Sequence, residues 1–143
     1  MIDFKERQKT VWQNMFYSIQ RIDLLVISVS GAGIYLCLES LKFMYTNKLP
    51  INSSLKVSAG FFVFAIVTNF ISQFLSYHSN MNDYLYCSEN QKEVQDEDSK
   101  QKAILYDNKS ETFNKWNNYF NYASAILMFV GLFICFLYFI MTF

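Results

Sequence analysis

The chain has 143 residues, enough for one domain, and its 12 basic and 12 acidic side chains give a formal net charge of zero. This balance gives no global attraction to nucleic acid, and we expect no stable nucleic-acid binding. Apolar residues make up 52% of the chain and charged residues only 17%. The charges cluster in a few segments, so long helical runs would lack the charged outer face of a soluble bundle. The composition therefore favours a membrane protein.

Residues 1–22 have apolar side chains at helical spacing, with lysines, arginines and glutamines mostly elsewhere. This pattern predicts an amphipathic helix in the headgroup zone, with Trp12 at the boundary. Packing of the same apolar face against other helices of the protein is an open alternative.

Three long apolar runs predict an all-α protein with three transmembrane helices. No Asp, Glu, Lys or Arg occurs in 24–38, 57–82 or 116–143. About 20 helical residues cross a bilayer, so the second and third runs qualify directly, and the first needs Glu39 and Lys42 included. We expect a hairpin over 23–82, with spans at 24–45 and 57–79, and a third span in 116–143. "TNKLPINSS" (46–54), with its Pro and Asn-Ser cluster, predicts the tight turn of the hairpin.

Residues 83–115 form the one sizeable polar segment, with eight acidic residues and five lysines for a net charge of −3. They contain no Gly or Pro, and we expect helical extensions of the second and third spans with an acidic tip near 90–100. The tip is either a plain solvated surface or a contact for a cytoplasmic regulator or ligand. Its candidate contacts are Glu93, Asp96, Glu97 and Asp98.

Lysine and arginine positions predict the orientation. The N-terminal and polar segments carry nine of these residues near the spans, and the hairpin side carries three. By the positive-inside rule the N-terminus and the polar segment lie in the cytoplasm and the C-terminus outside. We expect a multi-pass protein of the bacterial plasma (inner) membrane.

A strip of amides and hydroxyls follows the second span at helical spacing. It comprises Asn69, Ser72, Gln73, Ser76 and Asn80. An amide left unpaired in hydrocarbon is costly, so the strip must face protein or water. It either lines a pore, which three helices can enclose only as a homo-oligomer, or it bonds neighbouring helices together.

The first span has its own polar positions. Ser28 and Tyr35 are seven residues apart, and Glu39 follows four residues after Tyr35. We include these three in the candidate pore lining because a carboxylate within a span favours function. The alternative for Glu39 is a local pair with Lys42, both side chains reaching toward the interface.

Small residues in the spans predict close helix approach. The candidates are Gly31, Gly33, Gly60 and Gly131. The third span also carries Asn117, Asn121, Ser124 and Cys135 along one side.

No catalytic or cofactor chemistry is indicated. Cys37, Cys87 and Cys135 form no C-x-x-C pair, and His78 has no motif partner. We expect three reduced cysteines packed as small apolar groups, with Cys87 in the polar loop. The sequence predicts no enzyme, no metal site and no cofactor.

The organisation resembles small bacterial membrane effectors of the SLATT type. The matching features are "RQKTVWQNMFYSIQRID" leading into "LLVISVSGAGIYLCLES", the short "NKLPINSS" link and the charged helical region after residue 83. The resemblance implies an oligomeric pore or ion channel that disrupts membranes in antiphage defence. The alternative function is a non-conducting accessory or anchor subunit of a larger membrane complex.

Overall fold

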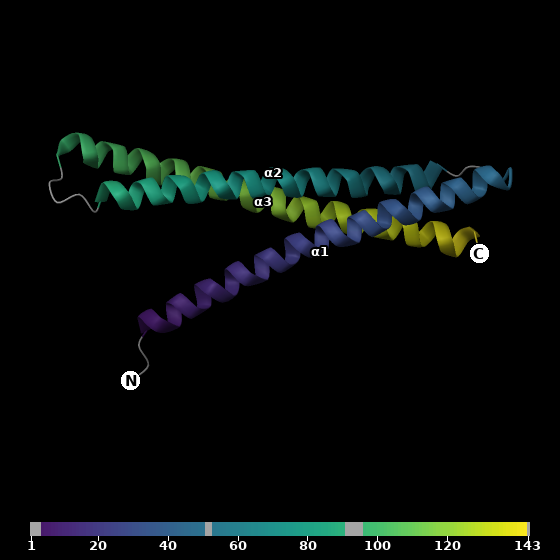
Figure 1. Cartoon of the computed structure of the whole chain (residues 1–143), viewed down its shortest axis with the longest axis horizontal. Helices are drawn as coiled ribbons and strands as arrows, with labels where there is room; N and C mark the ends of the chain where they lie inside the picture. Colours follow the sequence, from purple (N-terminus) through teal and green to yellow (C-terminus); the bar gives the residue numbers. More distant parts are fainter. Residues whose placement is uncertain (1–3, 51–52, 91–95, 143) are drawn as a thin grey trace. The chain divides into compact units, whose positions relative to one another are not determined.

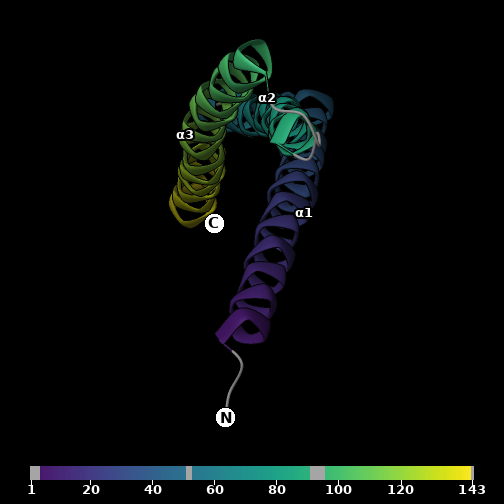
Figure 2. The same cartoon turned by 90° about the vertical axis from the view of Figure 1, so that its left-hand side faces the viewer.

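A computed structural model describes residues 4–50, 53–90 and 96–142, with side chains described from Gln20 onward. The described residues form three long helices and contain no strand. Their bounds are α1 Phe4–Thr46, α2 Ser53–Asn90 and α3 Glu97–Thr142. Figures 1 and 2 show each helix as an unbroken coil. The predicted all-α class is confirmed.

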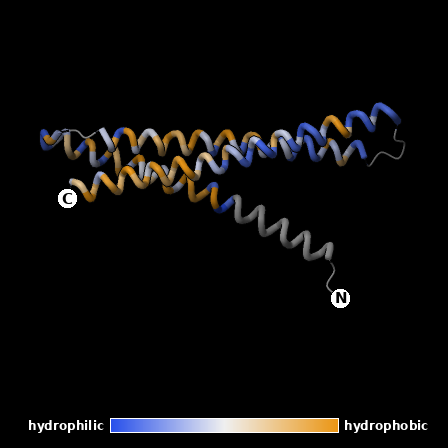
Figure 3. Tube along the Cα trace, turned by 180° about the vertical axis from the view of Figure 1, so that it is seen from behind, coloured by the Kyte–Doolittle hydropathy of each residue, from blue (hydrophilic) through white to orange (hydrophobic). Residues whose placement is uncertain are grey.

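Each helix is long and apolar enough to cross a membrane, in α1 over Gln20–Thr46. This agrees with the three predicted spans. In Figure 3 the hydrophilic colour gathers where α2 and α3 approach residues 91–95, and much of the rest of both helices is hydrophobic. α1 is continuous, so residues 4–22 share one helix with the first span. The side chains before Gln20 lie outside the description, and the amphipathic character of 1–22 stays a prediction.

The end of α1 is closed by local hydrogen bonds. Lys48 adopts a left-handed conformation with φ of 55°. The Lys48 amide donates to the Tyr45 carbonyl at 3.2 Å, and the Leu49 amide donates to the Met44 carbonyl at 2.9 Å. These two bonds define a Schellman motif, which satisfies carbonyls that would otherwise lack partners at the helix end. The helix therefore stops before Pro50 and lets the chain turn back.

The start of α3 is capped by Asp96. Its carboxylate accepts a hydrogen bond of 2.8 Å from the Ser99 amide, three residues on. Glu97 and Asp98 follow in the first turn, where negative charge is favoured by the helix dipole. The acidic residues therefore fix where the helix begins.

The helices divide into two compact units. The first contains α1, α2 up to Ile66 and α3 from Ala125; the second contains α2 from Val67 and α3 up to Ser124. Most of the buried apolar side chains lie in the first unit, in two clusters. One cluster is built around Phe62, Leu55, Cys37 and Cys135, and the other around Val26, Ala65 and Met128.

Burial follows a seven-residue repeat. The buried or half-buried face of α2 has alternating intervals of three and four residues: Leu55, Ser58, Phe62, Ala65, Asn69, Ser72, Ser76 and Ser79. On α3 the corresponding positions are seven apart: Ala103, Ser110, Asn117, Ser124, Gly131 and Tyr138. This is the spacing of a coiled-coil seam. Because the seam is rich in Ser, Ala and Gly, backbones can approach closely.

Candidate functional site

Ser72 is the centre of a polar cluster in the second unit. Its side chain is buried, and its hydroxyl oxygen lies 2.6 Å from Asn117 Oδ1 and 2.5 Å from Asn121 Oδ1. A hydroxyl has one proton to donate. Ser72 therefore donates to one amide oxygen, and the other contact is satisfied when that amide turns its NH₂ group toward the serine oxygen. The cluster ties α2 to α3 through side chains of both helices.

The predicted strip on α2 divides between two environments. Asn69 is fully buried, and its amide oxygen accepts a hydrogen bond of 3.0 Å from Gln73. Ser76 is half-buried, whereas Gln73 and Asn80 are exposed. The structure thus places Asn69 and Ser72 in the packing between helices, one of the two roles that the sequence left open. Gln73 and Asn80 remain on the surface of the protomer.

A second pair of hydroxyls joins the same two helices further along. Ser79 donates to the Ser110 carbonyl at 3.0 Å, and Ser110 donates to the Ser79 carbonyl at 3.1 Å. Neither serine was a sequence candidate. The seven-residue spacing from Ser72 to Ser79 and from Ser110 to Asn117 is the signal that identifies them.

The first unit has its own buried hydroxyl bridge. Ser58 is fully buried and donates to the Gly131 carbonyl at 2.8 Å, while the Cys37 thiol lies 3.8 Å from the Ser58 oxygen. Tyr138 donates to the Met44 sulfur at 3.2 Å. Ser30 is also buried, but its hydroxyl has no hydrogen-bond partner. Ser58 therefore links all three helices of this unit, and Ser30 carries an unpaired polar group.

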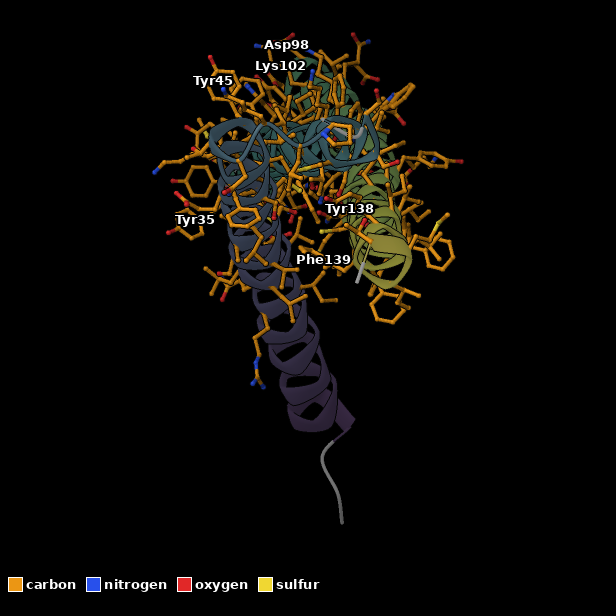
Figure 4. The ribbon with its side chains drawn as sticks, turned by 90° about the vertical axis from the view of Figure 1, so that its right-hand side faces the viewer. Tyr35, Tyr45, Asp98, Lys102, Tyr138 and Phe139 are labelled. Atoms are coloured by element: carbon orange, nitrogen blue, oxygen red, sulfur yellow. The ribbon has the colours of Figure 1, made fainter. Side chains whose placement is uncertain are left out.

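The outer face of α1 collects the remaining candidates. Ser28, Tyr35 and Glu39 are exposed, as is Lys42. Each residue turns the helix by about 100°, which puts these four opposite the buried face. Figure 4 shows Tyr35 projecting from α1 on the side away from α3, with Tyr138 between the two helices. Tyr35 is 63% exposed. The predicted polar positions of α1 thus share one outer face.

Glu39 pairs locally with Lys42 at 3.8 Å, and both side chains are at least half exposed. This is the local pair that the sequence offered as the alternative for Glu39. Both residues lie within two turns of the end of α1 at Thr46. Long charged side chains at such positions can reach the membrane interface, so Glu39 does not require burial in hydrocarbon.

The four candidate glycines differ in their surroundings. A Cβ atom at Gly33 would overlap the Phe62 ring, and one at Gly131 would lie 3.0 Å from that ring. At Gly31 and Gly60 a Cβ atom would meet nothing within 4 Å. The structure therefore brings Gly33 and Gly131 together around one aromatic ring, and leaves Gly31 and Gly60 in open space.

The cysteines fall into two groups. Cys37 and Cys135 are buried and reduced in the first unit, as expected of small apolar groups. Cys87 differs from the expectation: it lies on α2, which continues through the polar segment to Asn90, and it is exposed. Among the described residues no group of three or more His, Cys, Asp or Glu could hold a metal ion.

The acidic tip has structural partners. Asp98 pairs with Lys102 at 2.5 Å, and that hydrogen bond with its charge raises the pKa of Lys102. Asp96 caps α3, Glu97 is exposed, and Glu93 lies outside the described residues. Figure 4 labels Asp98 and Lys102 on this part of the chain. Glu97, in the first turn of α3, is thus the exposed acid of this tip that makes neither the cap nor the lysine pair.

We compared the chain with protein-family models, with curated proteins and with solved structures, and no comparison found a match.

Proposed function

We propose that the chain is one subunit of a homo-oligomeric membrane pore in which the outer polar face of α1 lines a shared hydrated pathway. The observation that supports this most is the arrangement of α1. It has one face filled by Val26, Gly33 and Cys37, and an opposite face with Ser28 and Tyr35 exposed. A lone protomer would turn that second face toward lipid.

Lipid is a poor environment for this face. Lipid tails cannot accept or donate hydrogen bonds, so hydroxyl groups in a span are favoured against protein or water. Gly31, on the same side of the helix, has open space where a Cβ would stand. Contact with another copy or with water in a shared pathway would satisfy the hydroxyls of Ser28 and Tyr35.

Several copies are needed because the space between the three helices of the first unit is filled at Phe62. The ring of Phe62 occupies the space between Gly33 and Gly131, and Phe62 itself is fully buried. A conduit would thus have to form between protomers, and closed rings of identical subunits are the common way for a chain to build one.

The membrane and the orientation of the chain are proposed from the sequence. The resemblance to SLATT-type effectors supports a bacterial antiphage protein that permeabilises the inner membrane, and the lysine and arginine distribution supports a cytoplasmic N-terminus and an external C-terminus. In this arrangement the exposed Glu97 would face a cytoplasmic regulator or ligand.

Ion flux from liposomes tests the proposal. Purified protein reconstituted at defined subunit number should release a trapped ion, and Ser28→Leu with Tyr35→Leu should change the rate. Leu36→Ile is the matched control, since Leu36 is an exposed apolar residue on the flank of the same helix. A correctly assembled ring that conducts nothing would rule the pore out.

A non-conducting anchor subunit is the second candidate. The burial of Asn69 and Ser72 in the packing between α2 and α3 favours it, because these amide and hydroxyl groups need no aqueous pathway. It predicts a complex of fixed stoichiometry with another protein after purification in mild detergent. A symmetric homo-oligomer would favour the pore.

A further inference from the structure

An open cavity of about 480 Å³, with polar and apolar side chains in its lining, lies between α2 and α3 in the second unit. His78 and Asn82 of α2 line it together with Asn108, Lys109 and Thr112 of α3, and Leu105 and Phe113 form its apolar wall. No Asp or Glu belongs to the lining described here. The lining therefore offers one permanent cation and several N–H and O–H groups, and it contains no carboxylate.

The imidazole is held in place by aromatic rings. His78 stacks on Phe113 with ring centroids 5.4 Å apart, and Phe74 meets it edge-on at 4.5 Å. These contacts fix the ring at the cavity wall. An N–H of the imidazole is thereby a positioned donor for a ligand.

The amide and hydroxyl of the lining are also fixed by the backbone. Asn82 donates one N–H to the His78 carbonyl at 2.7 Å, and Thr112 donates to the Asn108 carbonyl at 2.8 Å. Asn82 keeps a second N–H, and the Asn108 amide adds two more. Lys109 is exposed and provides an ammonium group. A tetrahedral anion with several acceptor oxygens matches this donor set.

The position of the cavity favours a membrane source for that anion. Trp116 and Tyr119 are exposed on α3 within two turns of Thr112, and exposed Trp and Tyr mark the level of the headgroups in membrane helices. Along α2, Tyr77 is exposed directly before His78. The cavity thus lies beside the level at which lipid phosphates are found, where basic pockets between helices bind headgroups.

We propose that this cavity binds a phosphate group, with Lys109 as its cationic contact and His78, Asn82 and Asn108 as hydrogen-bond donors. The source is either an anionic phospholipid headgroup or a free phosphate. The proposal does not depend on pore formation, because it uses only the second unit and its position near the membrane boundary.

The test is ligand-dependent thermal stability of the full chain in mild detergent, since a ligand that binds the folded state raises the midpoint. The probes are short-chain phosphatidylglycerol and inorganic phosphate. Phosphatidylglycerol should stabilise the wild type, and Lys109→Gln should raise its apparent Kd by about tenfold, the usual effect of losing one charged hydrogen bond. Lys109→Arg should retain binding.

Lys115→Gln is the matched control. Lys115 lies on the same helix as Lys109, and Lys115→Gln changes the net charge by the same amount as Lys109→Gln. The Lys115 side chain is not part of the cavity lining and pairs with Glu111 at 3.6 Å. It should bind as the wild type does. A response to phosphatidylglycerol alone identifies the lipid as the source, and an equal response to both probes identifies free phosphate. No response to either probe, or equal losses in Lys109→Gln and Lys115→Gln, would overturn the proposal.

Discussion

The ring of Phe62 packs where a side chain of Gly33 would stand. A Cβ atom at Gly33 would overlap that ring, and on its other side a Cβ at Gly131 would lie 3.0 Å from it. Phe62 is fully buried, so the ring cannot move away from one glycine without approaching the other. The contact therefore fixes the distance between three helices of the first unit.

Gly33→Ala should destabilise the protein. Alanine is favoured over glycine within a helix by about 1 kcal/mol, but overpacking of a filled core costs about 1–3 kcal/mol, and the second effect should prevail. Gly31→Ala lacks the overlap and should leave stability unchanged or raise it. Thermal unfolding in detergent measures both.

Phe62→Leu supplies the rescue. The double variant Gly33→Ala with Phe62→Leu should be more stable than Gly33→Ala alone, because the smaller side chain relieves the overlap. Phe62→Leu by itself should be destabilising. Equal midpoints for Gly33→Ala and Gly31→Ala would show that Gly33 has no special packing role.

Two serine substitutions should differ in their effect on stability. Ser58→Ala removes the hydrogen bond to the Gly131 carbonyl and should cost about 1 kcal/mol. Ser30→Ala removes a buried hydroxyl that has no partner, and should leave stability equal or increase it. Both side chains are fully buried, so the same unfolding measurement compares them directly. A larger loss for Ser30→Ala would contradict the assignment.

The Ser72 cluster should show coupling. Ser72→Ala and Asn117→Ala each remove a partner of the same contact, so the double variant should lose less stability than the two single losses combined, by about 0.5 kcal/mol or more. Asn118→Ala, an exposed neighbour, should be nearly neutral. Strict additivity of the pair would mean that the hydroxyl and the amide do not interact.

The thiols should differ in reactivity. A water-soluble maleimide should label Cys87 on the folded protein and leave Cys37 and Cys135 unmodified, because the last two are buried. Intact mass should rise by one adduct before denaturation and by three after it. Early labelling of three thiols would indicate that the first unit is open.

The second and third spans could be predicted because charge-free runs of span length are a strong signal, and the first because its charge-free run 24–38 reaches span length once Glu39 and Lys42 are included. The three predicted spans lie on the three helices as far as residue 142. The inward side of α3 could also be predicted from the sequence, since Asn117, Ser124 and Gly131 share one face. Membrane insertion is dominated by the sum of side-chain hydrophobicities, which needs no knowledge of tertiary contacts.

It was harder to predict which single polar side chains are buried and which are exposed. Asn69, Ser72 and Gln73 share a broad helical face, yet Gln73 is exposed while the other two are buried. The discriminating signal is the interval pattern of three and four residues from Leu55 to Ser79, which includes Ser79 and omits Asn80. Which glycine faces a bulky residue depends on Phe62, a residue of another helix, and no local pattern reveals that.

The most direct test of the proposed pathway is the water accessibility of position 35. In a Cys87→Ser background, Tyr35→Cys and Leu36→Cys would be reconstituted in bilayers and exposed to a membrane-impermeant thiol reagent. The pore account predicts rapid labelling of Tyr35→Cys and little labelling of Leu36→Cys, whose side chain is 52% exposed in the protomer and would contact lipid. Absence of labelling at position 35, or equal labelling at both positions, would contradict it.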